Sequence, residues 1–198
     1  MVRDWIGEFM SLLDHFGFLA PYYETFIKSR EPIELIRLAD FPIPGRLLDA
    51  GGGTGRVSNF LRECASQVVI ADLSCRMLSE AKGKGGLIPV CSHTEKLPFP
   101  DSCFERVIMV DVLHHVCDQK ETADELWRIL KPGGKLIIEE PDVRKFAVKL
   151  IAWGEKMALM RSHFLSPPKI VALFDEMNAD IRCVKKEHTA WVVVEKSV

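Results

Sequence analysis

The sequence predicts an α/β fold with a mostly parallel, doubly wound sheet, and two patterns support this prediction. From residue 46 onward, short runs rich in Val, Ile and Leu alternate with amphipathic helical patterns, as expected for a parallel sheet covered on both faces. The strand-like runs are 46–50, 67–71, 87–91, 104–110 and 135–139, and the helical segments are 55–64, 74–82 and 119–130. Near the end of the chain, runs 180–186 and 189–195 predict an antiparallel hairpin at one sheet edge.

The segments outside this alternation are predicted to be helical. Residues 1–45 form an N-terminal helical arm with an apolar stripe from Trp5 to Phe16 and two further segments at 22–28 and 32–39. The arm is either a cap over a ligand site or an additional packing layer, and the sequence leaves both open. Two more helices are expected after Glu140, at 143–161 and after the Pro167-Pro168 pair.

The composition is typical of one globular domain over residues 1–198, because 47% of the residues are hydrophobic and 27% are charged. With a net charge of −2, the chain lacks the overall excess of positive charge that is typical of proteins that bind nucleic acid. We expect neither a signal peptide nor a membrane span, since no apolar run is long enough. Six cysteines without a CxxC pair favour a reduced, cytoplasmic protein. The adjacent His114 and His115 lack the spacing of metal ligands, so we expect no metal.

The most informative stretch runs from Leu47 to Arg56, where an apolar run ends in Asp49 and four glycines follow within five positions. Glycine loses more freedom on folding than other residues, so such a turn indicates a positive φ or a close approach of a ligand. Strand, glycine turn and helix start together favour a nucleotide-type ligand. The alternative is a tight turn whose glycines serve packing alone.

A second acid follows at the end of the next strand-like run. Asp72 lies 17 residues after Gly55 (72 − 55), close to the distance at which an acid meets a ribose hydroxyl pair. A carboxylate accepts both hydroxyl hydrogens at once. The alternative is an ordinary acid capping the next helix, a role for which Ser74 competes.

These residues resemble a known family. Asp49 to Gly55 resembles the D-x-G-x-G-x-G loop of class I S-adenosylmethionine-dependent methyltransferases, whereas an NAD fingerprint would require glycine where this chain has Arg56. Further motifs run in the family's order: Asp72-Leu73-Ser74, Met77-Leu78, Leu97-Pro98-Phe99-Pro100-Asp101, Phe104, Val112-Leu113-His114-His115-Val116 and Leu130-Lys131-Pro132-Gly133-Gly134. The set resembles the ubiquinone and menaquinone biosynthesis branch over roughly residues 20–140. The resemblance implies a Rossmann-like fold and S-adenosylmethionine as cofactor.

The resemblance also implies which residues bind the cofactor. Asp49 would order the loop, and Asp72 would hold the ribose. His93 stands where relatives commonly carry an Asp that accepts from the adenine, and a neutral imidazole can still accept one hydrogen bond there. The other implied cofactor residues are Gly51, Gly53, Thr54 and Gly55 in the loop, Leu73 and Met77 beside the adenine, Thr94 after His93, Asp111 near the methyl group, and Tyr23 in the arm.

The residues after the fourth strand-like run are candidates for catalysis. Asp111 and His114 would border the methyl group, and the candidate bases are Asp111, His114, His115 and Tyr22. None has a motif that identifies it as a base, and His115 could equally be a packing residue. We expect methyl transfer to a small, apolar or aromatic metabolite. The alternatives are a non-catalytic S-adenosylmethionine-binding module and an NAD-type oxidoreductase, and the sequence leaves the oligomeric state open.

Overall fold

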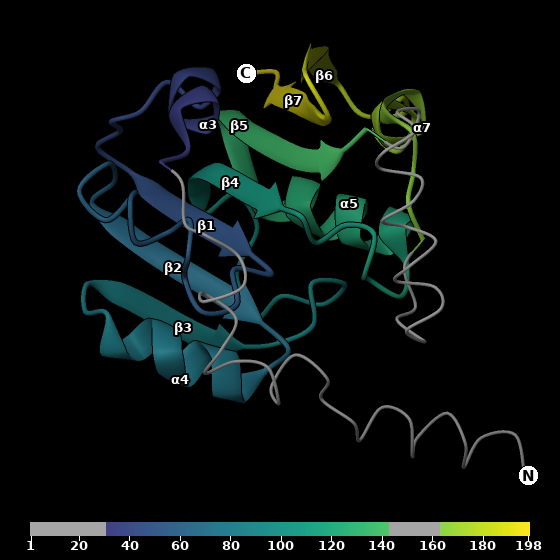
Figure 1. Cartoon of the computed structure of the whole chain (residues 1–198). Coiled ribbons are helices and arrows are strands. Elements are labelled where there is room, and N and C mark those ends of the chain that lie inside the picture. The colour runs from purple at the N-terminus through teal and green to yellow at the C-terminus, as the bar shows by residue number, and fades with distance from the viewer. Residues whose placement is uncertain (1–30, 143–162) are drawn as a thin grey trace, which may run out of the picture.

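The computed structural model describes residues 31–142 and 163–198. Within these residues, seven strands form one sheet in the order β3-β2-β1-β4-β5-β7-β6 (Figure 1). They are β1 (Arg46–Ala50), β2 (Gln67–Asp72), β3 (Leu87–Cys91), β4 (Phe104–Val110), β5 (Leu130–Pro141), β6 (Ala179–Lys186) and β7 (Thr189–Lys196). Neighbours among β1 to β5 pair in parallel, whereas β7 pairs antiparallel with β5 and with β6. The predicted fold and the C-terminal hairpin are confirmed.

The order of the strands determines where a ligand can bind. The chain proceeds from β1 outward through β2 and β3, and then returns to place β4 and β5 on the other side of β1. Residue Asp49 of β1 therefore pairs with Ile70 on one side and Ile108 on the other. Ligands of open α/β sheets bind beyond the carboxyl ends of the strands at such a reversal. Here that point lies beyond the ends of β1 and β4.

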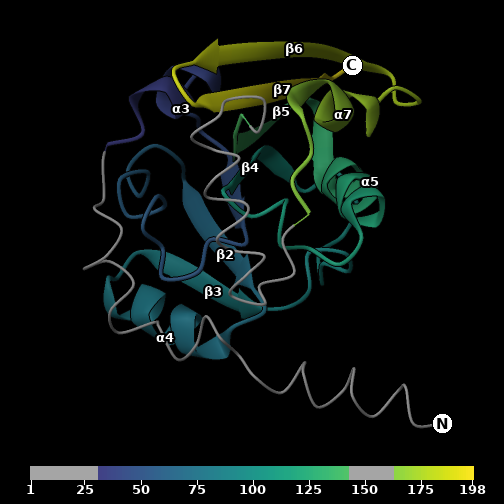
Figure 2. The ribbon, with the colours of Figure 1, turned by 45° about the vertical axis from the view of Figure 1, so that its right-hand side comes forward.

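Helices cover both faces of the sheet (Figures 1 and 2). One face packs against α3 (Ile33–Leu38), α4 (Cys75–Gly83) and the segment 55–64, which contribute the buried residues Leu35, Leu38, Val57, Leu61, Leu78 and Ala81. The other face packs against α5 (Gln119–Ile129) and α7 (Pro167–Ala172), which contribute Ala123, Leu126, Ile129 and Ile170. The two hydrophobic layers hold the sheet between them.

The segment 55–64 differs from its prediction. It is a run of turns in which the backbone N–H groups of Phe60, Leu61 and Cys64 each bond three residues back, as in tight turns rather than an α-helix. Its central residues include Val57 and Ser58, which have low helix propensity. The predicted burial of Val57 and Leu61 still holds, whereas Phe60 is exposed.

The described part of the N-terminal arm is a packing layer. Leu35 and Leu38 of α3 are buried against the sheet, and the carbonyl of Ala39 accepts a 2.5 Å bond from Arg106 Nε near the start of β4. This contact lies at the amino ends of the strands, away from the reversal point. The predicted segments before residue 31, with Tyr22 and Tyr23, and the predicted helix 143–161 lie outside the described residues.

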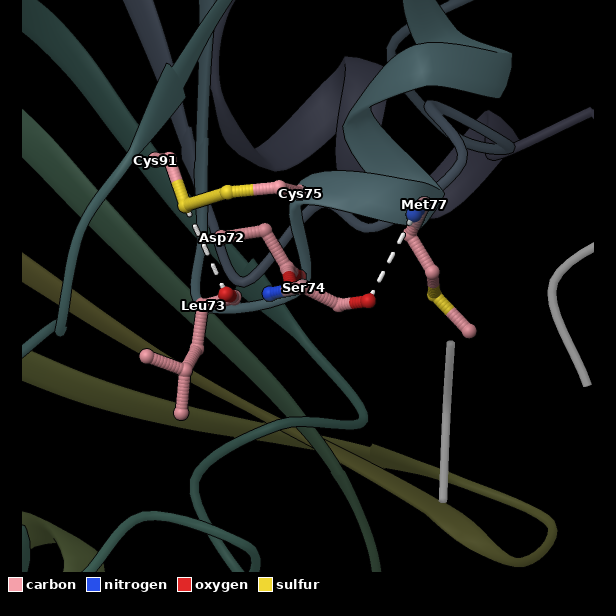
Figure 3. The surroundings of a disulfide bond; sticks show 6 residues. All are labelled: Asp72, Leu73, Ser74, Cys75, Met77 and Cys91. Atoms are coloured by element: carbon pink, nitrogen blue, oxygen red, sulfur yellow. Dashed lines mark hydrogen bonds between the residues drawn. A yellow bond between two sulfur atoms is a disulfide. The ribbon is translucent and has the colours of Figure 1, made fainter. Parts of the chain in front are cut away.

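The prediction that the cysteines are reduced is wrong for one pair. Cys75 and Cys91 form a disulfide with a Cα–Cα distance of 5.7 Å (Figure 3). The two residues are 16 positions apart, but the parallel pairing of β2 with β3 places Cys91 opposite Asp72. Because α4 begins three residues after Asp72, the register brings Cys75 to Cys91, and cysteine spacing alone could not reveal this.

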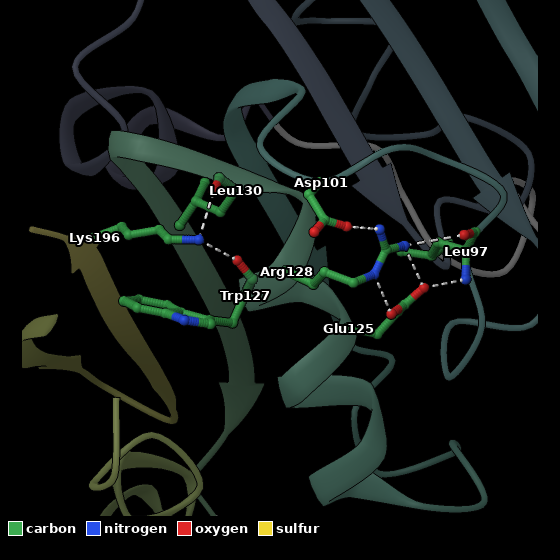
Figure 4. Close-up of polar contacts among 7 residues, drawn as sticks. All are labelled: Leu97, Asp101, Glu125, Trp127, Arg128, Leu130 and Lys196. Atoms are coloured by element: carbon green, nitrogen blue, oxygen red, sulfur yellow. Dashed lines mark hydrogen bonds and ion pairs between the residues drawn. The ribbon is translucent and has the colours of Figure 1, made fainter. Parts of the chain in front are cut away.

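Polar contacts attach α5 to the neighbouring loop and to β7 (Figure 4). Arg128 pairs with Asp101 at 2.6 Å and with Glu125 at 2.7 Å, and the same Glu125 oxygen accepts from the backbone N–H of Leu97 at 2.7 Å. On the other side, Lys196 donates to the carbonyl of Trp127 at 2.9 Å. The Leu-Pro-Phe-Pro-Asp motif is thus fixed to α5. No described helix has the length and hydropathy required to cross a membrane.

Candidate functional site

The glycine turn that follows β1 requires glycine for both conformation and space. Gly51, Gly53 and Gly55 have φ values of +78°, +53° and +74°, which other residues rarely adopt. A Cβ at Gly51 would overlap the side chain of Val112, and one at Gly53 would lie 3.0 Å from Met77 Sδ. The backbone of the turn therefore lies directly against the residues that follow β4 and against α4.

Asp49 connects β1 to this turn. It is buried, and its Oδ2 accepts a 2.6 Å hydrogen bond from the Ser58 hydroxyl. Burial raises its pKa to about 6; the Ser58 bond opposes this shift and the charge of Asp72 adds to it. Thr54 of the turn is buried as well. These contacts support the predicted role of Asp49 in ordering the loop.

Asp72 bridges the glycine turn and the start of α4. Its Oδ2 accepts from the backbone N–H of Gly53 at 2.9 Å, and its Oδ1 accepts from that of Ser74 at 2.8 Å. The helix cap is Ser74 itself, whose hydroxyl accepts from the N–H of Met77 at 3.5 Å (Figure 3). Asp72 is therefore not the N-cap of α4, and it stands at the end of β2 beside the turn.

The residues predicted to meet the adenine come from two neighbouring segments. Leu73 is 62% exposed and Met77 is buried at the start of α4. His93 and Thr94 follow β3, where His93 is largely exposed and Thr94 is buried. Because Asp72 pairs with Cys91 in the sheet, both segments lie at the same edge, next to Asp72.

Asp111 lies directly after β4 and is joined to the glycine turn. Its Oδ2 is 3.5 Å from a guanidinium nitrogen of Arg56, and its backbone N–H donates to the carbonyl of Glu139 at 2.9 Å. Its φ of +57° is unusual for a residue other than glycine. Such conformations persist where the surroundings enforce them, and they are frequent at functional sites.

His114 is held by Glu140, a residue that the sequence reasoning missed. The Nδ1 of His114 is 2.6 Å from Glu140 Oε2, and Glu140 Oε1 accepts from the backbone N–H of Leu113 at 2.7 Å. Both side chains are buried, and the ring of Phe164 stacks on His114 at 4.1 Å between centroids. A signal was present, because Glu140 follows the apolar run of β5 much as Asp72 follows that of β2.

Two further titratable groups lie beside this pair. Burial lowers the pKa of His115 to about 4, and the neighbouring His114 adds to the shift. Burial raises the pKa of Glu139 to about 7, although a 2.6 Å hydrogen bond from the Trp191 indole opposes it. At neutral pH His115 is therefore neutral and Glu139 is partly protonated.

The structure thus gathers the described candidates beyond the carboxyl ends of five neighbouring strands. The glycine turn, Asp72 and Asp111 are linked to one another by hydrogen bonds or ion pairs through Gly53 and Arg56. His93 and Thr94 stand beyond β3, and His114 and His115 stand beyond β4 next to the end of β5. Within the described residues, no group of three or more His, Cys, Asp or Glu side chains is arranged to hold a metal ion.

Comparison with known sequences identifies the central segment. Residues 48–138 match the family described as "Methyltransferase domain". The chain is 37% identical over 108 residues to the ubiquinone/menaquinone biosynthesis C-methyltransferase UbiE of Vibrio parahaemolyticus, which is 49% of this chain and 42% of the relative. The corresponding protein of Pseudomonas paraeruginosa is 33% identical over 115 residues, 53% of this chain and 45% of the relative. The chain thus spans less than half the length of these curated relatives.

Solved structures share the fold over most of their length. A chain from the complex of the Haloferax volcanii Trm112 methyltransferase activator with a methyltransferase has a TM-score of 0.79 at 17% identity, covering 93% of this chain and 99% of that chain. A Thermotoga maritima protein described as an S-adenosylmethionine-dependent methyltransferase has a TM-score of 0.69 at 21% identity, covering 92% and 98%. The sequence match thus relates residues 48–138 to the methyltransferase domain family, and the solved structures show that the fold of the chain is shared with methyltransferases.

Proposed function

We propose that the protein transfers the methyl group of S-adenosylmethionine to a small metabolite of apolar or aromatic character. The observation that carries this proposal is the bond between Gly53 N–H and Asp72. It joins the glycine turn to the acid at the end of β2, which are the two parts needed to hold the amino-acid portion and the ribose of one cofactor.

The residues present fit that cofactor. The turn has positive φ values at Gly51, Gly53 and Gly55, and such a backbone lets a ligand approach closely beside Asp72. Asp72 would accept from both ribose hydroxyls. Exposed Leu73 and the buried Met77 would pack on the adenine, with His93 and Thr94 in the neighbouring segment after β3.

When bound, S-adenosylmethionine supplies a methyl group on a sulfonium, which is an activated donor. The residues of the chain then have to orient the acceptor, because positioning can provide much of the rate acceleration. Asp111 and His114 stand beyond β4, where the acceptor would approach. His115, with a pKa of about 4, is a weak proton acceptor at neutral pH. Asp111 is held through Arg56 and His114 through Glu140, so both are positioned to orient an acceptor there.

The acceptor class rests on the relatives. The similar proteins of Vibrio and Pseudomonas are named for C-methylation in ubiquinone and menaquinone biosynthesis, and this favours an aromatic ring as acceptor here as well. The net charge of −2 gives no general attraction for nucleic acid.

Transfer of a labelled methyl group tests this proposal. The full chain is incubated with methyl-labelled S-adenosylmethionine and with fractions of a small-molecule extract, and products are separated by chromatography. We expect label in a fraction of apolar or aromatic metabolites, and much less with the Asp72→Ala variant. Cofactor binding without label in any fraction would instead indicate a non-catalytic binding module.

A further inference from the structure

We propose that the Cys75–Cys91 disulfide is a redox modification site that sets the affinity of the protein for S-adenosylmethionine. The reactant would be a small thiol or dithiol reductant, glutathione being the probe of choice. The proposal rests on the proposed function, because it concerns the same cofactor site.

The disulfide lies at the ribose end of that site (Figure 3). Cys75 is the first residue of α4 and Cys91 is the last residue of β3. Between them, Asp72 pairs with Cys91 in the sheet, and its carbonyl accepts from the backbone N–H of Ser92 at 3.0 Å. The bridge therefore links the segment that contains Asp72 to the segment that follows β3.

Those two segments carry the residues assigned to the adenine and the ribose. One segment, 72–77, contains Asp72, Leu73 and Met77. The other, 91–94, contains His93 and Thr94. A covalent bond across them limits how far the two segments can move apart. Because Asp72 also holds Gly53, a shift of its segment would reach the glycine turn.

Both cysteines are accessible to a reductant. Cys75 and Cys91 are exposed in the structure, whereas disulfides that only support a core are usually shielded from solvent thiols. The remaining four cysteines of the chain are free. Of these, Cys183 lies in β6 at the far edge of the sheet. It provides a matched exposed cysteine with no contact to the site.

The reaction is ordinary thiol–disulfide exchange. A glutathione thiolate attacks one sulfur of the bridge, the S–S bond breaks, and the other cysteine leaves as a thiolate that takes up a proton. A second glutathione then displaces the protein from the mixed disulfide. The bridge is reduced to two thiols by two electrons, and two glutathione molecules are oxidised to one disulfide.

Reduction is expected to loosen the site without unfolding the protein. The N-terminus of α4 keeps its Ser74 cap, and Asp72 keeps its two backbone donors. What is lost is the fixed spacing between α4 and the end of β3. A ligand that requires this spacing binds the oxidised form more tightly, and by linkage its binding opposes reduction to the same extent.

Calorimetric titration with S-adenosylmethionine tests the proposal on the wild-type chain in both redox states, with the state of the bridge verified by mass spectrometry after alkylation. We expect the reduced protein to bind about tenfold more weakly, within the usual range of coupling between two sites. Cys75→Ser and Cys91→Ser should bind like the reduced protein regardless of redox state, whereas Cys183→Ser should respond like the wild type. In glutathione buffers, the cofactor should lower the midpoint potential of the bridge by about 30 mV for that tenfold effect.

The outcomes separate this inference from the proposed function. Equal affinity in both redox states, or failure of the oxidised protein to form the bridge, would overturn the inference and leave the function intact. If neither form binds S-adenosylmethionine, the proposed function itself is overturned. Circular dichroism of the reduced protein distinguishes loss of affinity from loss of fold.

Discussion

The Nδ1 of His114 lies 2.6 Å from Glu140 Oε2 in a site where both side chains are almost fully buried. The pair joins the loop after β4 to the end of β5, and the same carboxyl group holds the backbone N–H of Leu113. Removing either partner would leave the other without this hydrogen bond in a buried place. The loop that carries the candidate catalytic residues Asp111, His114 and His115 is fixed by this pair.

Glu140→Gln should lower the free energy of unfolding by about 1–3 kcal/mol, the cost of leaving a buried polar group unsatisfied. Glutamine has one acceptor oxygen, whereas the native residue serves two groups, Leu113 N–H and His114 Nδ1. Glu139→Gln is the matched control, because Glu139 accepts a side-chain hydrogen bond from Trp191 and keeps an acceptor oxygen after the change. Urea unfolding at about pH 5.5 compares them. Equal losses in the two variants would contradict the account of Glu140.

Gly51→Ala should destabilise the protein by about 2 kcal/mol or more. Its φ of +78° is unfavourable for alanine, and the added methyl group would overlap Val112. Gly83→Ala is the control, since Gly83 is the last residue of α4 and has no atom within 4 Å of the position of a Cβ. It should be neutral or slightly stabilising. Thermal unfolding of both variants is the measurement, and similar melting temperatures would show that the turn is misplaced.

Asp72→Ala should weaken binding of S-adenosylmethionine by roughly 1.5–3 kcal/mol, the size of a hydrogen bond to a charged group. The side chain also holds Gly53 and Ser74, so Asp72→Asn, which keeps one acceptor oxygen, should have a smaller effect. Asp101→Asn is a control at an exposed acid outside the site. Calorimetry on the three variants gives the comparison, and unchanged affinity in Asp72→Ala would rule out a ribose contact.

Glu139 makes stability depend on pH in a defined direction. Its pKa rises from 4.5 to about 7, mainly through burial. Because the folded state holds this proton more tightly than the unfolded chain, the stabilisation is complete below about pH 4.5 and is lost as the pH rises through about 7. Glu139→Gln has no such proton, so between about pH 5 and pH 8 its free energy of unfolding should fall less than that of the wild type, by up to roughly 3 kcal/mol.

The titration of His115 changes the stability with pH in the opposite direction. His115 is present both in the wild type and in the Glu139→Gln variant. Its pKa is lowered from 6.5 to about 4, so its contribution is present above about pH 6.5 and is lost as the pH falls through about 4. Subtracting the two urea-unfolding profiles removes this contribution. A difference that does not change with pH would show that Glu139 titrates normally.

Local sequence patterns were sufficient to predict those features that follow from burial or from backbone conformation. The strand at 46–50 agrees with β1, and the capped helix predicted at 74–82 agrees with α4 within one residue at each end. The glycine turn was recognisable because its positive φ values exclude other residues. Each of these features depends on residues that are near one another in the sequence.

Features that depend on distant partners were not predictable. The sequence pattern at 55–64 predicts which residues are buried but not the backbone conformation. The Ser58 hydroxyl is bonded to the distant Asp49, and several backbone N–H groups of the segment bond three residues back. The Cys75–Cys91 bond requires the register of β2 with β3. The role of Glu140 depends on the pairing of β5 with β4, which brings Glu140 to His114, 26 residues earlier in the chain.

The central claim is that the glycine turn and Asp72 hold S-adenosylmethionine. Calorimetric titration of the oxidised wild-type chain with S-adenosylmethionine, and separately with NAD, tests it most directly. We expect saturable binding of S-adenosylmethionine, because the glycine turn is joined to Asp72 through Gly53, and no comparable binding of NAD, because Arg56 stands where a third glycine would be required. Tight binding of NAD without binding of S-adenosylmethionine would contradict the account.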